Sequence, residues 1–585
     1  MKLSYSIVSF LSLTAQFTLA ELKCRPEGPV LPRPTALSNS PIFQAATTNL
    51  TETLNAALSG SITAGWPTSN VSFSLAVVSA DQDDPGVPIW EYHHLAPANT
   101  KGTKKLDRDS QYLVGSITKV FTDYVLLKSG MDLDAPVTEY LPGLDGKSNI
   151  QWRDVSLRML ASYLGGTPAN YGFSDFYLLK EVFLAYGLPA IEDNDYPPCG
   201  VVGLNKGYIL SGMRDSYPQT TPNESPAYSN MAFVLIGMAL EEYTGKTYAQ
   251  LLEKITSGPL DMTNTFPSPG DDDKAVIPHG DSSWGLDYKL NTPAGGLVSS
   301  LSDLSKFSHA LLSRTLNMTS TEINGWLKPN AFAGNAYTLT GMPWEILRLP
   351  NLTPEHPHAV TIYGKSGGAQ NYRSQLSLID DYGLAIIILT AGPMKAAPIL
   401  TNAMISTFVA AADDVSREQA GRYEQRYMSD NEDEVLIEAA LEKDEDSMIL
   451  TSLHRNGTDI LSSLTEIWGL TLGDFLPGVG PKVRVFPSQL SENATLDGES
   501  VLKEVWHLWP ELKSGFETDL PGNEIEEMNC VGWSIQDWVH YGGEPLDRVL
   551  LYVGDNGGVR GFEVPFLRSG ILYPVKQETK QSLAN

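Results

Sequence analysis

A serine and a lysine three residues apart, Ser116 and Lys119, most strongly constrain what this chain can fold into. The turn Gly115-Ser116 leads directly into an apolar run, which predicts a helix that begins at or just before Ser116. Residues three apart lie on one face of a helix, so the lysine amine can reach the serine hydroxyl. A desolvated lysine can accept the proton of a serine and make it a nucleophile. The stretch therefore predicts a catalytic pair.

The spacing by itself is not specific, because Ser500 and Lys503 repeat it. A first partner motif is Tyr228-Ser-Asn230, the only Tyr-x-Asn in the chain, on a loop before a helical pattern. A phenol near two ammonium groups can relay a proton, first as a base and then as an acid. The asparagine can orient the lysine and donate to a substrate amide.

A second partner motif is Lys365-Ser366-Gly367, on a predicted strand that is followed by a turn and another strand. The same triplet begins at Lys128 and Lys513. Lys128 lies further along the helix of the serine and cannot face back into the site. Lys513 lies in a late stretch of different composition. Only Lys365 follows the tyrosine motif on a strand of the same domain.

Lys365 of the second motif and Gly368, which follows the motif, would each contribute to catalysis. Two ammonium groups about 4 Å apart repel by about 4 kcal/mol at an effective dielectric of 20, so Lys365 would help to keep Lys119 neutral. Gly368 has no side chain and can present its N–H to an oxyanion. The N–H of Ser116 would be the second donor, and each donor lowers a barrier by about 3 kcal/mol.

These three motifs, in this order, resemble the family of class C β-lactamases, penicillin-binding proteins and related esterases. The resemblance extends from about Val71 to Ala410 and includes two flanking stretches, Leu235-Ile-Gly237 through Pro259-Leu-Asp-Met262, and Pro293-Ala-Gly-Gly-Leu-Val-Ser299. The sequence is particularly similar to fungal secreted β-lactamase-like proteins with a C-terminal β domain. Ser366 departs from the usual threonine, and the chain between the lysine and tyrosine motifs is longer than usual.

The resemblance implies an α+β protein with the β-lactamase/transpeptidase-like fold, in which an antiparallel sheet is flanked by helices and faces a helical lobe. It also implies a serine hydrolase that acts through an acyl-enzyme. The catalytic residues would be Ser116, Lys119 and Tyr228, and the substrate-binding residues would be Asn230, Lys365, Ser366, Gly367 and Gly368.

The chain is long enough, at 585 residues with 42% hydrophobic content, for more than one domain. Residues 1–20 resemble a secretory signal peptide, with an apolar run and a small-residue cleavage site. We expect a catalytic domain over 21–412, an acidic helical connector over 413–446 and a mostly β C-terminal domain over 447–585. The last prediction depends on short strand patterns and turns such as Asp497-Gly498.

The charge and the N-terminus favour a secreted protein. A net charge of −28 and a pI near 4.7 argue against nucleic acid or anionic membranes as partners. No later apolar run in the sequence approaches the roughly 18 residues of a membrane span. Seven glycosylation sequons are compatible with a secreted glycoprotein, at Asn49, Asn70, Asn223, Asn317, Asn351, Asn456 and Asn493.

Three cysteines allow one disulfide. We expect Cys24 to pair with Cys199, because Cys530 lies in what reads as another domain. No metal-type spacing of cysteine and histidine occurs, and His93-His94 and His356-Pro-His358 read as loop or strand-end residues. We therefore expect no metal and no cofactor. The sequence does not indicate an oligomeric state.

Three other interpretations of the function have to be considered. Gly364-Lys-Ser-Gly-Gly368 fits the Gly-x-Ser-x-Gly elbow, which would make Ser366 the nucleophile, but that elbow must enter a helix and the chain after Asn371 reads as a strand. An acyltransferase or transesterase that tailors a secreted metabolite would use the same acyl-enzyme. A non-catalytic ligand-binding descendant is disfavoured, because every catalytic position carries a suitable residue.

The expected substrate is a small amide or ester. Lys365 and Ser366 would form a cationic, hydroxyl-bearing wall suited to a substrate carboxylate. Penicillin-like compounds would acylate Ser116 but turn over slowly, because no residue in the sequence is clearly placed to activate the hydrolytic water.

Overall fold

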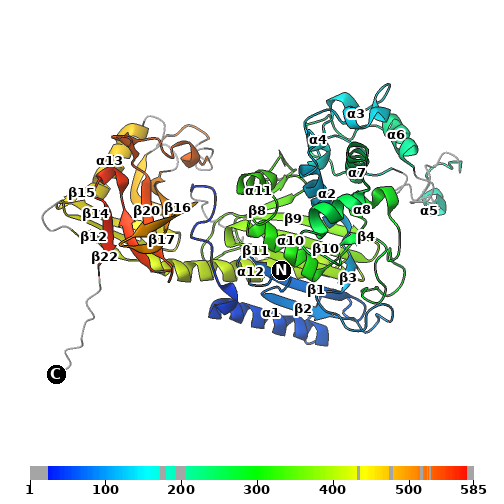
Figure 1. The fold of residues 1–585 in the computed structure, drawn as a ribbon, viewed down its shortest axis with the longest axis horizontal. Coiled ribbons are helices and arrows are strands. Elements are labelled where there is room, and N and C mark those ends of the chain that lie inside the picture. Colours follow the sequence, from blue (N-terminus) through cyan, green and yellow to red (C-terminus); the bar gives the residue numbers. More distant parts are fainter. Residues whose placement is uncertain are drawn as a thin grey trace, which may run out of the picture. The chain divides into compact units, whose positions relative to one another are not determined.

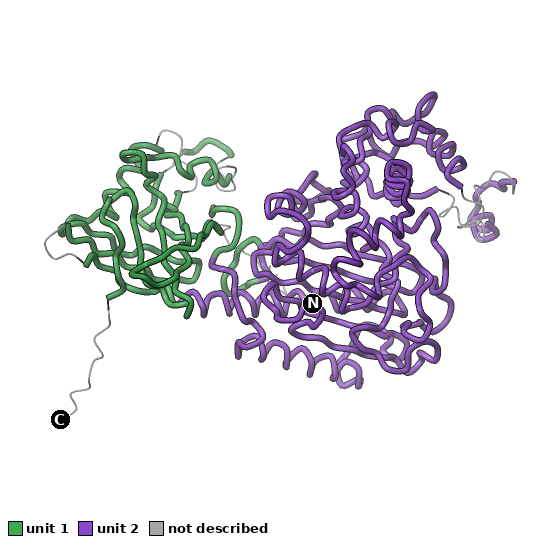
Figure 2. The backbone as a smooth tube through the Cα atoms, viewed as in Figure 1, with its two compact units in different colours: residues 1–30, 353–359, 422–585 green, residues 31–352, 360–421 purple. Residues whose placement is uncertain are grey.

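Two compact units make up the chain (Figure 2). The computed structural model describes residues 24–171, 180–192, 205–430, 435–473, 478–513, 518–522, 525 and 529–575. The larger unit comprises residues 31–352 and 360–421, and the smaller unit comprises residues 1–30, 353–359 and 422–585. The expected signal peptide, residues 1–20, and Cys199 lie outside the described residues.

An antiparallel sheet of eight strands forms the centre of the larger unit (Figure 1). Its order is β2-β1-β11-β10-β9-β8-β7-β6. All eight residues of β11 are buried, which explains why this strand is a continuous apolar run rather than an alternating one. The strands are β1 (Ser72–Ser79), β2 (Trp90–His94), β6 (Ala331–Phe332), β7 (Thr338–Thr340), β8 (Glu345–Leu349), β9 (Val360–Ala369), β10 (Tyr372–Ile379) and β11 (Leu384–Ala391).

Helices cover both faces of this sheet. Because successive side chains of a strand point to opposite faces, Ile387 and Ile388 enter different hydrophobic clusters. Ile388 packs in the cluster that contains Phe408 of α12, whereas Ile387 packs in the cluster that contains Phe307 of α10. The covering helices are α1 (Pro41–Ser59) and α12 (Ala396–Ala420) on the first face and α2 (Thr118–Leu127) and α10 (Leu301–Leu312) on the second.

A helical lobe lies beyond α2 (Figure 1). Its central helix α7 is buried continuously from Met231 to Leu240, as expected for a helix surrounded by other elements. The helices of the lobe are α3 (Val137–Tyr140), α4 (Leu157–Ala161), α6 (Lys206–Asp215), α7 (Asn230–Thr244) and α8 (Tyr248–Leu252); α5 (Lys180–Ala185), α9 (Thr292–Gly295) and α11 (Ser320–Leu327) complete the unit. The expected sheet, flanking helices and helical lobe are thus all present.

A small three-stranded sheet holds the start of α2. Its order is β3-β5-β4, with β3 (Gln111–Leu113), β5 (Leu297–Ser300) and β4 (Phe266–Pro267). The N–H of Val114, just after β3, donates to the carbonyl of Leu297 at 3.1 Å. This bond anchors the chain immediately before the serine motif.

The smaller unit contains a strand-rich barrel. Nine strands follow the order β13-β12-β22-β21-β20-β17-β16-β14-β15, and an additional pairing of β13 with β14 closes the sheet. The strands are β12 (Arg426–Ser429), β13 (Ile437–Lys443), β14 (Met448–Arg455), β15 (Thr458–Asp459), β16 (Val479–Leu496), β17 (Glu499–Leu512), β20 (Arg548–Gly554), β21 (Val559–Glu563) and β22 (Ile571–Pro574), with a separate pair β18 (His540–Tyr541) and β19 (Glu544–Pro545).

One helix of this unit, α13 (Ile460–Leu472), packs on β14 and β16. Its buried residues Leu464, Trp468 and Leu472 recur every four positions and so share one face of the helix. The predicted turn at Asp497-Gly498 joins β16 to β17, where Leu496 pairs with Glu499. The mostly β character of the C-terminal region is therefore confirmed.

The prediction of a helical connector over 413–446 is wrong beyond Ala420. Helix α12 ends there, and Arg426–Ser429 and Ile437–Lys443 are strands of the barrel. The acidic residues that suggested a solvated helix are compatible with strands that expose one face, as in Glu438 and Glu442 on β13. Charge density alone does not distinguish the two structures.

The disulfide prediction is also wrong, because Cys24 pairs with Cys530 rather than with Cys199. Residues 24–30 belong to the smaller unit although 506 positions separate the two cysteines. The indole N–H of Trp509 donates to the Cys24 carbonyl at 3.2 Å. The N-terminal segment is thus attached to the C-terminal barrel by a covalent bond and by a hydrogen bond.

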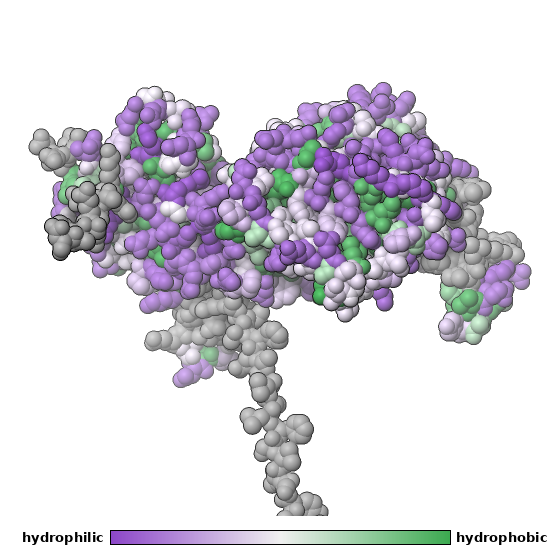
Figure 3. Space-filling view, turned by 90° about the horizontal axis from the view of Figure 1, so that it is seen from below, coloured by the Kyte–Doolittle hydropathy of each residue, from purple (hydrophilic) through white to green (hydrophobic). Residues whose placement is uncertain are grey.

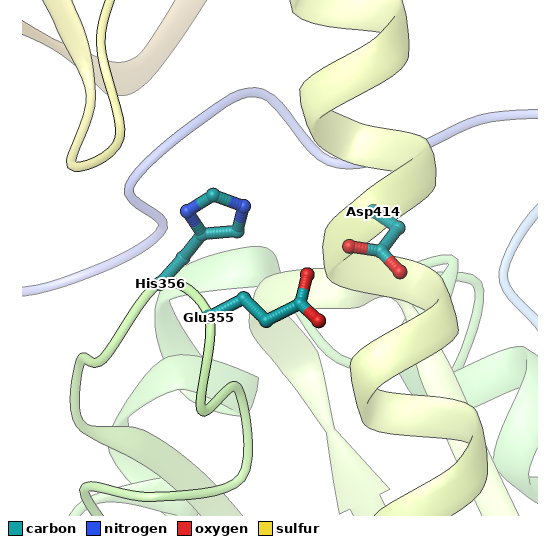
Figure 4. Close-up of side chains that lie close together, drawn as sticks. All are labelled: Glu355, His356 and Asp414. Carbon is teal, nitrogen blue, oxygen red and sulfur yellow. The ribbon is translucent and has the colours of Figure 1, made fainter.

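The loop between β8 and β9 contributes Thr353–Ala359 to the smaller unit. Figure 4 shows Glu355 and His356 on this loop, and Asp414 on α12. The ring Nδ1 of His356 lies 2.8 Å from the Glu445 carbonyl, and Arg25 Nη2 donates to the Ala359 carbonyl at 2.8 Å. Both contacts are made within the smaller unit.

One helical stretch, Ala396–Tyr423, is long and apolar enough to cross a membrane, with a mean hydropathy of 1.2. However, 56% of the 18-residue window that meets this test is buried, and α12 packs against α1, β10 and β11. Such burial is typical of a core helix.

Hydrophilic residues dominate the face shown in Figure 3, where hydrophobic residues form separate small patches.

Removing the disulfide should destabilise the smaller unit. We expect the Cys24→Ser/Cys530→Ser variant to lose about 2–5 kcal/mol of unfolding free energy, since the open chain gains conformational freedom when unfolded. Scanning calorimetry of the full chain would show a lower melting transition for the barrel, with the transition of the larger unit unchanged. Superimposable traces of the variant and the parent would contradict this stabilising role.

Candidate active site

The turn before α2 brings Ser116 against the part of β9 that β8 does not cover. Ser116 lies in a short 3-10 turn, Gly115–Ile117, directly before α2. Gly115 has φ of 52°, and a Cβ at this position would meet the backbone N of Gly368 at 2.4 Å. Only glycine therefore permits this close approach of the two segments. The approach places the N–H of Ser116 near that of Gly368 on β9.

Lys119 is fully buried beneath Ser116. Its Nζ lies 2.9 Å from Ser116 Oγ and 2.7 Å from Asn230 Oδ1, and it also contacts the Ala294 carbonyl. Burial, followed by the positive charge of Lys365, holds the pKa of Lys119 well below its usual value. A neutral amine has two N–H bonds, which the amide oxygen and the carbonyl can accept. Its lone pair is then left for the Ser116 hydroxyl.

Tyr228 completes the contacts of the serine. Its hydroxyl donates to Ser116 Oγ at 2.7 Å, and its ring is stacked on Tyr163 at 5.1 Å. The ring centroid lies 5.1 Å from the Nζ of Lys119 and 5.3 Å from that of Lys365. Tyr228 is 41% exposed, so a ligand can reach its hydroxyl.

Asn230, the first residue of α7, connects the lysine to a residue that the sequence did not single out. Its Nδ2 donates to Asn170 Oδ1 at 2.8 Å, while its Oδ1 accepts from Lys119. This bond identifies which end of the Asn230 amide faces the lysine. The Ser229 hydroxyl caps α7 by accepting from Ala232 N at 2.9 Å, which fixes the loop that carries Tyr228.

Lys365 lies fully buried on β9 and forms an ion pair with Glu345, the first residue of β8. The Glu345 carboxylate also accepts from the N–H of Ser366 at 2.8 Å. Burial raises the pKa of Glu345, but Lys365 and these hydrogen bonds outweigh it and the pKa is lowered. The ammonium group of Lys365, which was expected to bind a substrate carboxylate, is therefore already paired with a carboxylate of the protein. The sequence carried no motif that would have found Glu345.

The edge of β9 is open beside Ser116. Pairing of β9 with β8 ends at Gly364, which lies opposite Glu345, whereas pairing with β10 continues to Ala369 opposite Tyr372. Hydrogen-bonded pairs alternate along an antiparallel ladder, and the pair that flanks a two-residue turn is a bonded one. Gly368 is therefore in a non-bonded position, so that its N–H and carbonyl point away from β10. The Ser366 N–H points to the same edge, since it reaches Glu345.

Gly367 separates these two outward-facing residues and faces the serine turn. A Cβ here would meet the Val114 carbonyl oxygen at 2.0 Å and Ser374 Oγ at 2.2 Å. No side chain fits, so the glycine of the Lys-Ser-Gly motif is required by packing. All eight residues predicted from the sequence thus lie around one place in the larger unit.

Ser366 does not lie on a nucleophile elbow. It is in the middle of β9, and the chain turns after Ala369 directly into β10 without entering a helix. Its hydroxyl is a hydrogen-bond partner of the Glu345 carboxylate. The alternative assignment of the nucleophile to this segment is not supported by its geometry.

Asp123 is a second residue that the sequence did not single out. It lies four positions after Lys119 on α2 and is fully buried, and neither carboxyl oxygen has a hydrogen-bond partner among the described residues. Burial raises its pKa well above the usual value, against an opposing effect of Lys119. The buried helix face below the serine thus carries an amine whose pKa is lowered and a carboxyl whose pKa is raised, and both shifts favour the uncharged forms.

Comparison with known proteins found similar sequences and structures. A family model described as Beta-lactamase matches residues 77–404, and one described as Beta-lactamase-like-like, C-terminal domain matches residues 415–574. A "Beta-lactamase-like protein" of Arthroderma benhamiae is 42% identical over 97% of this chain and 99% of its own length. A "Probable hydrolase M10" of Phoma sp. is 25% identical over 82% of this chain and 81% of its own. The crystal structure of a D-stereospecific amidohydrolase from Streptomyces sp. has 21% identity and a TM-score of 0.44, and covers 60% of this chain and 97% of that one.

The burial of Asp123 predicts a pH-dependent stability difference. A carboxyl whose folded pKa is raised contributes stability that is complete below its unfolded pKa and is lost as pH rises toward its folded pKa. Asp123→Asn cannot ionise, so its unfolding free energy relative to the parent should increase from roughly pH 4 to pH 8. The increase should be about 1.4 kcal/mol for each pH step over which the carboxyl ionises only in the unfolded chain. Urea unfolding across this range measures the difference.

The exposed Asp273→Asn variant is the matched control for this measurement. It removes a carboxyl without burial, so its curve should run parallel to that of the parent. A parallel curve for Asp123→Asn as well would mean that Asp123 titrates in the folded protein as it does in the unfolded chain.

Proposed function

The chain belongs to the beta-lactamase family, and from that premise we propose that it is a secreted serine hydrolase that cleaves a small amide or ester through an acyl-enzyme on Ser116. The family consists generally of serine hydrolases, and relatives are named as probable hydrolases. The single observation that carries the proposal is the contact of the buried Lys119 amine with the Ser116 hydroxyl at 2.9 Å.

In acylation, Ser116 Oγ forms a bond to the carbonyl carbon of the substrate while its proton passes to Lys119 Nζ. The carbonyl oxygen becomes an oxyanion and accepts hydrogen bonds from the N–H groups of Ser116 and Gly368. Each such donor contributes about 3 kcal/mol to transition-state stabilisation. The close approach at Gly115 keeps these two donors next to each other.

The tetrahedral intermediate then collapses, and the bond to the leaving amine or alcohol breaks. The leaving group takes a proton from the Tyr228 hydroxyl, which is replenished by the proton held on Lys119; the two groups meet at Ser116 Oγ. In deacylation, water adds to the acyl carbon and gives a proton to the same pair. The bond from the acyl carbon to Ser116 Oγ then breaks, and Oγ takes that proton back. The product acid is released and the enzyme returns to its starting state.

Lys365 acts mainly by its charge on Lys119. It is held in place by Glu345, which compensates the charge locally without removing the ammonium group. The ammonium of Lys365 would repel a protonated Lys119, so the neutral amine is favoured. Asn230 orients the amine toward the serine.

Secretion is part of the proposal. The N-terminal sequence has the pattern of a signal peptide, and the Cys24–Cys530 disulfide supports an oxidising compartment. We also propose that β-lactams acylate Ser116 and are released slowly.

The nucleophile assignment can be tested with a fluorophosphonate probe for active-site serines. Ser116→Ala should abolish labelling, because no other hydroxyl in the described site contacts a buried amine. Ser366→Ala is the matched control and should retain substantial labelling. Labelling that survives the first substitution and disappears with the second would move the nucleophile to Ser366.

Lys119 and Tyr228 should behave as one proton-transfer unit. Lys119→Ala and Tyr228→Phe are each expected to lower kcat by two or more orders of magnitude, within the range of general base catalysis. Residues that act together are not additive, so the double variant should lose little more than the worse single variant. Stopped-flow acylation by an activated ester measures the rates. Multiplicative losses in the double variant would refute a shared relay.

A further inference from the structure

Arg373 carries a guanidinium group without a carboxylate partner among the described residues. Its Nη2 lies 3.7 Å from the Met394 sulfur, a weak acceptor. A guanidinium has five N–H donors, so most of its capacity is available to a ligand. Six other arginines of the larger unit differ in this respect, because carboxylates pair with Arg33, Arg108, Arg153, Arg158, Arg314 and Arg417.

The guanidinium lies next to the proposed oxyanion donor. Arg373 is directly opposite Gly368 in the β9–β10 ladder, in the non-bonded type of pair that brings side chains closest. A Cβ at Gly368 would lie 2.6 Å from Arg373 Nη1 and 3.1 Å from its Cζ. The guanidinium therefore occupies the space that the missing side chain leaves. By standard backbone dimensions, Nη1 and the Gly368 N lie within about 5 Å of each other.

The geometry of proton transfer decides which part of a substrate faces Arg373. The leaving group must lie near the Tyr228 hydroxyl, and the Tyr228 ring lies beside Lys365. The other substituent of the carbonyl, the acyl chain, must then extend away from Lys365 along the open edge of β9. That direction passes Gly368. The Arg373 guanidinium covers Gly368 on the sheet face opposite to the serine turn, and it is reached around the edge of β9 that β8 leaves open.

The two cations of this strand pair differ in what they can offer a substrate. Lys365 is fully buried and paired with Glu345, so an incoming carboxylate would have to displace an existing ion pair. Arg373 is only partly buried and has no such pair to break. A guanidinium can also bind a carboxylate through two parallel hydrogen bonds, which a lysine cannot do.

We propose that Arg373 binds an anionic group, of the carboxylate type, on the acyl portion of the substrate and thereby selects half-esters or half-amides of dicarboxylic acids. This inference rests on the proposed function, because it assumes an acyl-enzyme at Ser116. It moves the expected carboxylate site from Lys365 and Ser366, on the leaving-group side, to the opposite end of the β9 edge. Arg373 is a specificity-determining residue, and it takes no part in proton transfer.

The test compares two esters that differ in one charge. Mono-p-nitrophenyl adipate carries a carboxylate at the end of its acyl chain, and its methyl ester is neutral; shorter diacids are avoided because their half-esters cleave themselves through cyclic anhydrides. The secreted full-length protein should have at least a tenfold higher kcat/KM for the anionic ester. Arg373→Gln should remove most of this preference, by about tenfold or more, mainly through KM.

Three controls separate binding of the carboxylate from a structural effect. Arg373→Gln should leave the kcat/KM of the neutral methyl ester within about twofold, and Arg373→Lys should restore part of the preference, since it keeps the charge but loses the fork. Arg153→Gln removes an exposed arginine of the helical lobe and should leave the preference unchanged. Equal losses for both esters in Arg373→Gln would overturn the inference, as would a preference that survives this substitution.

Labelling of the same preparations by the fluorophosphonate probe distinguishes the two levels of failure. A parent enzyme that is labelled at Ser116 and hydrolyses both esters without preference contradicts the role of Arg373 and leaves the proposed function intact. Absence of labelling and of turnover with either ester contradicts the proposed function itself, and the role of Arg373 falls with it.

Discussion

The structure of the site depends on keeping one buried amine neutral. Lys119 has no exposed surface, and its Nζ and that of Lys365 both lie close to the Tyr228 ring, at 5.1 and 5.3 Å from the ring centroid. Desolvation and like charge both favour the neutral form, and both arise because the serine turn packs against β9 while α2 packs against α7. Glu345 allows Lys365 to remain charged while buried, because it supplies the carboxylate that an isolated ammonium would need. Glu345, at the end of β8, thus stabilises the positive charge of Lys365. That charge in turn lowers the pKa of Lys119 beside the serine.

The second requirement is the close approach of two backbone segments. The serine turn meets β9 only because Gly115 and Gly367 lack side chains at the contact. The approach occurs where β8 ends and β9 continues with one open edge. An open edge usually needs protection from other chains, and here it is short and lies against the serine turn. The same edge provides an N–H for an oxyanion, and an acyl chain can extend along it toward Arg373.

The smaller unit is held together differently. Its barrel closes through the pairing of β13 with β14. Cys24 is attached to this unit by the disulfide to Cys530 and by the hydrogen bond from Trp509. None of the proposed catalytic residues belongs to this unit. The match of a separate C-terminal family model to residues 415–574 agrees with a domain that has its own fold.

The sequence by itself determined the three motifs, their order and the type of each main element. A Ser-x-x-Lys pair at a helix start, a tyrosine loop and a Lys-Ser-Gly strand are local patterns, and helix and strand periodicities are local as well. Only the tertiary structure decided which residues surround these motifs. Glu345 and Asn170 come from elements far from the serine motif in the sequence and reach the site through strand pairing and helix packing, which no local pattern encodes. The pairing of Cys24 with Cys530 and the strands within the acidic 413–446 region were missed for the same reason, because each depends on contacts between segments far apart in the chain.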